Sequence, residues 1–311
     1  ARNAKLKGRL IFAATADEEA GGVFGVKWLV KNYKGKITAD FTVTEGGWNP
    51  MRIADETCHF IQIGEKGIIR PRLKTRGLSA HGSVPMLGDN AIVKMADVIK
   101  SLAEYQPQIV LIPEVKQLIQ AVAKLEGLGD KISEENIDHV IQMLPDRILA
   151  GYFTAITRMS VSANVVNGGV KVNIIPDSCE AEVDIRVLPG QNKEYIDKEL
   201  GSVIGNAEIE ITQSNTATFS ISDTEFYKLI SNTMKESVND AMILPCVSSG
   251  GSDSRHLRGL GIPCYGIGMM ALDLDDRMRQ SMHGKDEKID IDSLRLKSDF
   301  LIRLAKKYLG D

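Results

Sequence analysis

Three carboxylates stand in a row early in this sequence, at Asp17, Glu18 and Glu19, directly after the apolar run 8–15. Adjacent carboxylates repel one another unless cations or solvent separate them. Taken alone, they fit a solvated acidic turn, which the N-terminus of a following helix would stabilise. The alternative is a division of labour, in which one carboxylate ligates a metal ion and its neighbour acts as general base on a metal-bound water.

A second acidic turn and a late histidine are candidates for the same site. Glu45 follows the apolar run 39–43 and is followed by Gly46 and Gly47, so no side chain would obstruct an ion there. In isolation Glu45 fits an ordinary turn residue equally well, but two acidic strand ends on neighbouring strands favour a shared site. His283 lies in the loop before the last predicted helix. An imidazole beside carboxylates is typical of zinc sites.

Two further segments have residue types suited to binding. His81 lies between small residues in the segment 77–85, which keeps its imidazole accessible. The glycine-rich turn 250–253 precedes a short helix, and the backbone N–H groups of such a turn can hold an anion, although a plain turn is the alternative. The remaining histidines have no comparable setting and are interpreted as structural: His59, His139 and His256.

The composition excludes several classes of protein. A length of 311 residues allows two domains, and a net charge of -3 gives no electrostatic support for a nucleic-acid partner. No apolar run approaches the roughly 20 residues that a membrane span needs. Four widely separated cysteines without a CxxC pair predict buried thiols in a reducing compartment, and hence a cytoplasmic protein. Phosphate-loop, dinucleotide-binding and GxSxG patterns are not found in the sequence.

The predicted elements that position these residues follow two patterns. Ligands bind beyond the carboxyl ends of strands in open α/β sheets, which is where the acidic turns fall. Strands are predicted at 8–15, 39–43, 241–247 and 262–267, with helices at 23–32, 223–238 and 290–308. A different, α+β pattern lies between them: strands at 68–75, 152–166, 170–175, 179–188 and 207–212, and helices at 90–102, 192–203 and within 105–148. We therefore predict an α/β fold with a discontinuous catalytic domain at 1–64 and 214–311 and an inserted α+β domain at 65–213.

Taken in order, the motifs resemble the M20 metallopeptidase family, which includes acetylornithine deacetylases, succinyl-diaminopimelate desuccinylases, aminoacylases and carboxypeptidases. The resemblance implies an open-sheet, zinc-peptidase-like catalytic domain and an inserted lid and dimerisation domain. It also implies metal-dependent hydrolysis of an amide bond in N-acyl amino acids. The matching segments are ATADEEAGG (14–22), TEGGW (44–48), GLSAHGSVPMLGDNAI (77–92), the segment 164–190, GGSDSRHLRGLGIPCYGIG (250–268) and SMHGKDEKI (281–289).

The resemblance also implies a role for each metal-site residue. Glu18 would be the general base, Glu19 and His283 would ligate one metal ion, and Glu45 would ligate the other. Two Zn2+ ions per subunit are expected, with Co2+ or Mn2+ as alternatives. His81 would reach across a homodimer formed through the inserted domain and stabilise the oxyanion of the partner's substrate.

The same resemblance implies a site for the carboxylate of a small-molecule substrate, an acyl amino acid or short peptide. Asn164, Arg186 and the turn at Gly251 and Ser252 would bind it, and Arg suits this task because its guanidinium is bidentate. Substrate choice stays open. Desuccinylases tend to have basic residues just before the glycine that opens the lid, whereas this sequence reads Glu65-Lys66-Gly67, which weakens a diaminopimelate substrate without supporting another.

The sequence departs from the family pattern upstream of Glu18. The family has a His-x-Asp ligand motif and a metal-bridging Asp well before the glutamate pair, whereas only seventeen residues precede Glu18 here and none is a histidine. The sequence also starts without Met, directly before an apolar run. We therefore predict that N-terminal ligands are missing and that the chain alone is inactive. The alternatives are a di- or tripeptidase or carboxypeptidase with the same machinery, and a non-catalytic dimeric binding relative.

Overall fold

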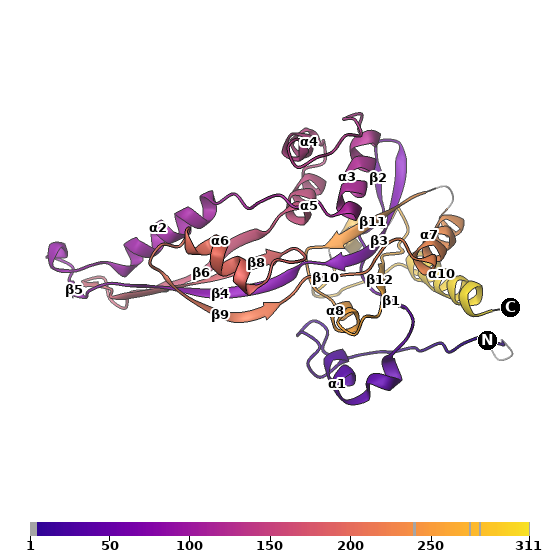
Figure 1. Cartoon of the computed structure of the whole chain (residues 1–311), viewed down its shortest axis with the longest axis horizontal. Coiled ribbons are helices and arrows are strands. Elements are labelled where there is room, and N and C mark those ends of the chain that lie inside the picture. The colour runs from indigo at the N-terminus through magenta and orange to yellow at the C-terminus, as the bar shows by residue number, and fades with distance from the viewer. Residues whose placement is uncertain (1–4, 239–240, 274, 280, 311) are drawn as a thin grey trace. The chain divides into compact units, whose positions relative to one another are not determined.

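The computed structural model describes residues 5–238, 241–273, 275–279 and 281–310, which form two compact units (Figure 1). The first unit comprises Ala1–Glu65, Ile112–Ala150 and Thr218–Asp311, and the second comprises Lys66–Leu111 and Gly151–Ala217. This grouping differs from the predicted boundaries at residues 112–150, which the sequence pattern places in the inserted domain. The reason is that helix α3 (Pro113–Leu125) packs against strand β11 (Met242–Ser248) of the first unit.

A six-stranded sheet forms the centre of the first unit, and β3 (Glu56–Glu65) pairs with four of its strands. Strand β11 is parallel to β3, whereas β2 (Met51–Ile53), β10 (Thr218–Phe219) and β12 (Cys264–Ile267) are antiparallel to it; β1 (Thr42–Thr44) is parallel to β12. The last eight residues of β3 are all buried, as expected for a strand covered on both faces.

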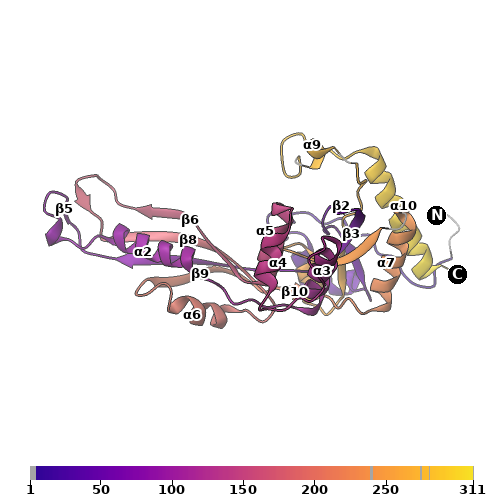
Figure 2. The ribbon, with the colours of Figure 1, turned by 90° about the horizontal axis from the view of Figure 1, so that it is seen from above.

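Helices cover this sheet and lead into its turns. Figures 1 and 2 show α7 (Glu225–Ser237) and α10 (Ile291–Leu309) side by side, and the two helices are in contact. The remaining helices of the unit are α1 (Val26–Ile37), α4 (Ile137–Met143), α8 (Ser254–Arg258) and α9 (Asp276–Arg279), together with the start of α5 (Arg147–Thr157). The predicted strands at 241–247 and 262–267 and the helices at 223–238 and 290–308 are confirmed with small shifts.

The prediction of a buried strand at residues 8–15 is wrong. The segment is irregular, it takes part in none of the strand pairings found in the described residues, and Phe12 is 92% exposed. A strand satisfies its backbone N–H and C=O groups only through a neighbouring strand. An apolar run without such a neighbour therefore does not become a strand, however hydrophobic it is.

The second unit has a four-stranded antiparallel sheet in the order β6-β8-β4-β9. The strands are β4 (Gly67–Arg76), β6 (Ser160–Gly168), β8 (Ser178–Val187) and β9 (Glu208–Asn215). Helices α2 (Ala91–Glu104) and α6 (Lys193–Gly201) start at Asn90 and Asn192, whose side chains accept N-capping hydrogen bonds. Both helices contribute to the one apolar core that also contains the sheet residues. The predicted α+β architecture is confirmed.

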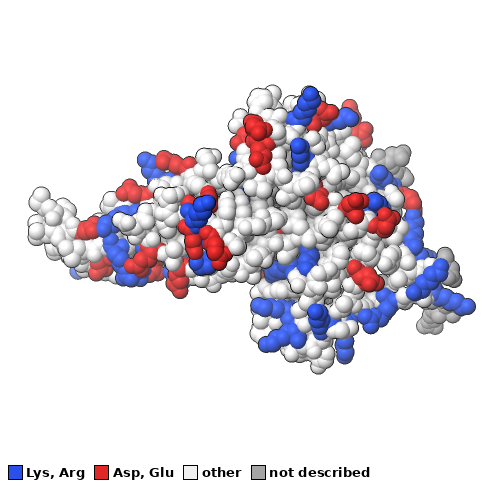
Figure 3. Space-filling view, in the orientation of Figure 1, with Lys and Arg blue, Asp and Glu red and all other residues white. Residues whose placement is uncertain are grey.

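Alternation along the strands gives this sheet one apolar and one charged face. In β4, Ile69 and Leu73 belong to the core, while Arg70, Arg72 and Lys74 form ion pairs with carboxylates of β8. Figure 3 accordingly shows both signs of charge interspersed on this unit, with an uncharged end around β5 (Ala80–His81) and the 3-10 turn η1 (Pro85–Leu87).

Two strand predictions in this unit are wrong in part. Residues 152–157, predicted as strand, are the end of α5, because Leu149, Phe153 and Ile156 are buried at helical spacing. Of the strand predicted at 170–175, only β7 (Ile174–Ile175) forms, paired with β5.

One charged side chain is buried in the second unit. Lys66 is 2% exposed, and its Nζ donates hydrogen bonds to the backbone carbonyls of Ala155 (2.6 Å) and Arg158 (2.7 Å). These carbonyls lie at the C-terminal end of α5, where a cation interacts favourably with the helix dipole.

Two predictions from composition can be compared with the structure. The four cysteines are free and buried, as predicted. Among the helices in the described ranges, none combines the length and the hydropathy of a bilayer-spanning segment.

Candidate functional site

The acidic turn after residue 16 is built by its first carboxylate. Asp17 adopts a left-handed conformation (φ 69°), its carbonyl accepts a hydrogen bond from Gly22 N (2.6 Å), and its Oδ2 accepts one from Phe24 N (2.9 Å). Asp tolerates this conformation better than most residues. Asp17 is therefore committed to the turn, and it leaves Glu18 half-buried and Glu19 exposed.

Negative charge gathers around Glu18. Burial raises the pKa of Glu18, and the carboxylates of Glu45, Glu19 and Asp253 raise it further, while the Arg255 guanidinium opposes them. Residues far apart in the sequence thus lie close enough to interact at one end of the sheet. A carboxylate whose pKa is raised toward the working pH is suited to general-base catalysis.

The turn that carries Glu45 depends on two glycines. Gly46 (φ 99°) and Gly47 (φ 80°) are left-handed, and Gly47 N donates to the side-chain oxygen of Gln62 at 2.9 Å. A Cβ on Gly47 would lie 2.7 Å from the backbone nitrogen of Gly268, so no larger residue fits. Glycine therefore allows the end of β1 to approach β3 and the segment after β12, with Glu45 exposed at the turn.

His283 lies beside the acidic turn. Its Nδ1 is 3.1 Å from Glu19 Oε1, and both side chains are largely exposed. Imidazole and carboxylate are both ligands that Zn2+ accepts, so this pair suits one ion and Glu45 suits another. Within the described ranges, however, no three His, Cys, Asp or Glu side chains are placed to hold an ion together. The donor types therefore fit a divalent metal, but the described residues provide no complete ligand shell.

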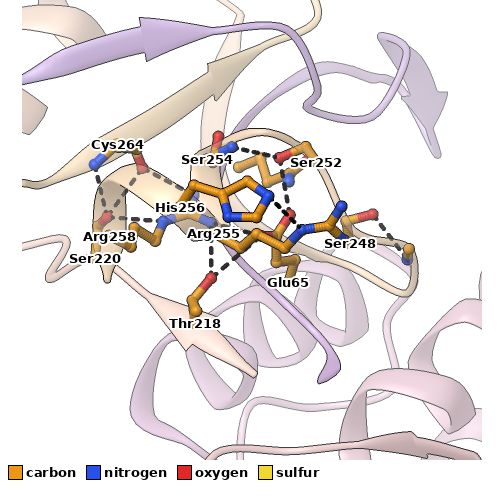
Figure 4. Close-up of polar contacts among 12 residues, drawn as sticks. Glu65, Thr218, Ser220, Ser248, Ser252, Ser254, Arg255, His256, Arg258 and Cys264 are labelled. Atoms are coloured by element: carbon orange, nitrogen blue, oxygen red, sulfur yellow. Dashed lines mark hydrogen bonds and ion pairs between the residues drawn. The ribbon is translucent and has the colours of Figure 1, made fainter. Parts of the chain in front are cut away.

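The turn at Gly251 and Ser252 rests on a buried ion pair (Figure 4). Ser252 is buried, and its hydroxyl donates a hydrogen bond to Glu65 Oε2 at 2.8 Å. Glu65 Oε1 accepts from the Thr218 hydroxyl (3.2 Å) and lies 3.6 Å from Arg258 Nη1. The Ser252 hydroxyl is therefore occupied, whereas Gly251 is exposed. A ligand at this turn would meet backbone N–H groups rather than the hydroxyl.

The ion pair itself was not predicted from the sequence. Arg258 also donates to the Cys264 carbonyl (2.9 Å) and to the Ser220 hydroxyl (3.1 Å). Burial raises the pKa of Glu65, and Arg258 together with the hydrogen bond from Ser252 opposes that rise. The available signal was a glutamate at the end of a run of apolar strand residues, for which burial requires a partner.

His81 lies in β5 of the second unit and is exposed. Ser83 N donates a hydrogen bond to its Nδ1 at 3.2 Å, and the Ser83 hydroxyl lies 2.7 Å from the same atom. Since a backbone N–H can only donate, the neutral ring carries its proton on Nε2. His81 thus presents Nε2–H as a hydrogen-bond donor.

Asn164 and Arg186, the predicted substrate ligands of this unit, have different settings. Asn164 is the extra residue of a β-bulge, where pairing of β6 with β8 shifts between Ala163 and Val165, and its side chain is exposed. Bulges often re-aim a side chain near a functional site. Arg186 lies on the charged face and forms an ion pair with Asp184, with Nη2 3.2 Å from Oδ2.

The fold thus combines an open sheet, with the acidic turn of Glu45 directly after β1, and a second unit with an antiparallel sheet and two helices. Comparison with known proteins agrees with the resemblance that the motifs predict. Residues 63–212 match the peptidase dimerisation domain of the M20 family. Together with the relatives described next, this match confirms the resemblance to the M20 metallopeptidases that the motifs predict.

Curated relatives of this chain are distant and longer than it. A probable carboxypeptidase S-like protein from Dictyostelium discoideum is 26% identical over 319 residues, which cover 96% of this chain and 60% of that protein. A probable succinyl-diaminopimelate desuccinylase from Staphylococcus aureus is 22% identical over 247 residues, covering 76% of this chain and 57% of the relative. The chain thus spans about 60% of the length of these relatives.

Solved structures share the fold. An M20 family metallo-carboxypeptidase from Sulfolobus solfataricus has a TM-score of 0.63 at 19% identity, covering 94% of this chain and 68% of that one. A tripeptidase from Staphylococcus aureus has a TM-score of 0.61 at 17% identity, covering 94% and 62%. At these identities the likeness establishes the fold of this chain and leaves its substrate open.

Proposed function

We propose that the protein hydrolyses an amide bond in N-acyl amino acids with the help of divalent metal ions, two Zn2+ per subunit. The observation that carries this proposal is the contact between His283 and Glu19, beside a Glu18 that interacts with Glu45. An imidazole and carboxylates from three distant segments gathered at one place favour a cation site over a solvated acidic turn. Relatives named as a desuccinylase and a carboxypeptidase support a hydrolase.

Each residue has a role in this reaction. Glu19 and His283 would hold one ion and Glu45 the other, and a bound ion would polarise the scissile carbonyl and acidify water. Glu18 takes the proton from the attacking water and delivers it to the leaving nitrogen, for which its raised pKa is suited. The Nε2–H of His81, from the partner subunit of a homodimer, donates to the oxygen on which negative charge develops.

The substrate carboxylate would be bound by Asn164, by Arg186 and by the backbone at Gly251 and Ser252. Arg186 offers a bidentate guanidinium, which would exchange Asp184 for the substrate. We also propose that the protein is located in the cytoplasm.

Two alternatives have specific observations in their favour. A peptidase or carboxypeptidase would use the same residues on a different substrate, and the names of two similar proteins favour it. A non-catalytic dimeric binding protein is favoured by the incomplete ligand shell of the described residues. Turnover with a panel of N-acyl amino acids and short peptides separates the two enzymes, and metal content separates both from the binding protein.

The test uses the protein in its native length, with Glu18→Gln and His81→Ala as variants. Glu18→Gln should leave metal content unchanged and lower kcat by at least about 10²-fold, as for loss of a general base. His81→Ala should lower kcat by a comparable factor, while the exposed His139→Ala should behave as wild type. Wild-type turnover by Glu18→Gln would contradict the proposed role of Glu18, and a native-length protein with neither metal nor turnover would support the binding protein.

A further inference from the structure

The orientation of the Glu18 carboxylate depends on the turn that carries it. In the described part of the chain this carboxylate makes no hydrogen bond, although like charges surround it. The direction in which this carboxylate points therefore depends on the backbone of the turn that carries it. That backbone is fixed by contacts three residues before Glu18 and three to four residues after it.

The contact before Glu18 is a hydrogen bond across the sequence. The Thr15 hydroxyl donates to Asp253 Oδ2 at 2.9 Å. Asp253 lies directly after Ser252, whose hydroxyl bonds to the buried Glu65, so Asp253 extends from an anchored turn. The second carboxylate oxygen of Asp253 is buried and has no hydrogen-bond partner among the described residues, so only the bond to Thr15 engages this side chain.

The contacts after Glu18 involve Gly21, Gly22 and α8. His256 interacts with the backbone of Gly21, and its Nε2 accepts a hydrogen bond from Arg255 Nε at 3.3 Å (Figure 4). A Cβ on Gly22 would lie 2.7 Å from Asp253 Oδ1 and 3.6 Å from His256 Nε2. The turn and the start of α8 are therefore in direct contact, and Gly22, which is left-handed (φ 68°), allows this approach.

We propose that Asp253 and His256 are positioning residues that hold the Glu18 turn from both sides through Thr15 and Gly21. The inference rests on the proposed function of Glu18 as general base. Asp253 and His256 contact neither substrate nor reacting atoms in this scheme. They act by limiting the positions that Glu18 can take, and a displacement of about 1 Å can cost roughly 10²-fold in rate.

The first test compares Thr15→Val, Asp253→Ala and Asp253→Asn in the native-length protein. The first two remove the hydrogen bond, and each should lower kcat by about 10-fold or more while KM changes much less. The double variant Thr15→Val/Asp253→Ala should be no slower than Asp253→Ala, because both changes break the same bond. Asp253→Asn keeps an oxygen that can accept from Thr15, and it should restore most of the rate. Thr38→Val, which removes an exposed hydroxyl bond to Lys34, is the control and should be silent.

A second measurement does not depend on activity. In Asp253→Ala and in His256→Phe, amide hydrogens of Gly21, Gly22 and Phe24 should exchange at least about 10-fold faster, while those of α7 and α10 should not change. If exchange and kcat are both unaltered while Glu18→Gln is inactive, the positioning role is refuted and the general base stands. If Glu18→Gln is as active as wild type while exchange still rises, the contacts are present but the proposed function of Glu18 fails.

Discussion

Replacing Arg258 by methionine should destabilise the first unit more than any surface change. Arg258 and Glu65 are 2% and 1% exposed, so Arg258→Met removes the cation and leaves a carboxylate inside the protein. Removing one partner of a buried ion pair typically costs about 3–5 kcal/mol. The lower end applies here, about 3 kcal/mol, because Ser252 and Thr218 still donate hydrogen bonds to Glu65.

The loss of stability caused by Arg258→Met should increase with pH. Burial raises the pKa of Glu65 and Arg258 lowers it, so the variant should have a still higher folded-state pKa. A carboxyl with a raised pKa binds a proton more readily when folded than when unfolded. The contribution of this carboxyl to the free energy of unfolding is therefore greatest in acid. It is lost as pH rises from the unfolded-state pKa through the folded-state pKa. The free energy of unfolding of Arg258→Met should fall furthest below that of wild type near pH 8, and less far at pH 5.

The assay is urea unfolding followed by tryptophan fluorescence at both pH values. The chain has two tryptophans, Trp28 and Trp48, and both belong to the first unit, so the signal reports on that unit. Arg295→Met, which removes an exposed pair with Asp292, is the matched control and should cost less than about 1 kcal/mol.

A double variant separates charge from packing. Glu65→Gln/Arg258→Met removes both charges, so it should be more stable than the sum of the two single changes predicts, by about 1–3 kcal/mol. If the free energy of unfolding of Arg258→Met lies within about 1 kcal/mol of the wild-type value at both pH values, the buried pair does not stabilise the unit in this way, because removing one partner of such a pair should cost more.

Two further predictions concern Lys66 and Gly47. Burial lowers the pKa of Lys66 to about 7, so between about pH 7 and 10 the unfolded chain binds the extra proton and stability from this group rises with pH. Lys66→Met should abolish that rise in urea titrations followed by far-UV circular dichroism, and parallel pH curves for the two proteins would contradict it. Gly47→Ala should cost at least about 1–3 kcal/mol, because strain at positive φ adds to a clash with Gly268. Gly129→Ala is the control, because Gly129 also has a positive φ but lies in open space, so this variant measures the cost of backbone strain alone. If the two variants lose the same stability, the clash with Gly268 is unimportant.

Elements with a clear period were predictable from the sequence. In β4, apolar Ile69 and Leu73 alternate with charged Arg70 and Arg72, and this pattern alone fixes which face is buried. The N-caps Asn90 and Asn192 likewise mark the starts of α2 and α6 from local chemistry.

Errors arose where the decisive fact is not local. The run 8–15 is apolar enough for a strand, but no neighbouring strand is available to it in the described structure. Strand β3 was not predicted, although four strands pair with it, because a strand buried on both faces has no alternation to detect. Residues 152–157 contain β-favouring side chains, yet burial at helical spacing extends α5 through them.

The candidate site also contains residues that could be predicted from the sequence and residues that could not. Motifs predicted that Glu18, Glu19 and His283 matter, and the structure brings Glu19 and His283 into contact. The partnership of Glu65 with Arg258 could not be read from the sequence, because it depends on which strand end faces α8.

Environment separates two kinds of carboxylate that the sequence cannot distinguish. Glu65 is buried, and its charge is met by Arg258 and by two hydroxyl donors, so structure alone accounts for it. Glu18 is the opposite case, because its nearest charges are mostly carboxylates and its side chain has no hydrogen bond within the described residues. Keeping like charges together without donors costs stability, and folding gives no reason to do so. A bound cation would offset that cost, so Glu18 and its neighbours fit a role in binding and catalysis, whereas Glu65 fits a role in supporting the turn beside them.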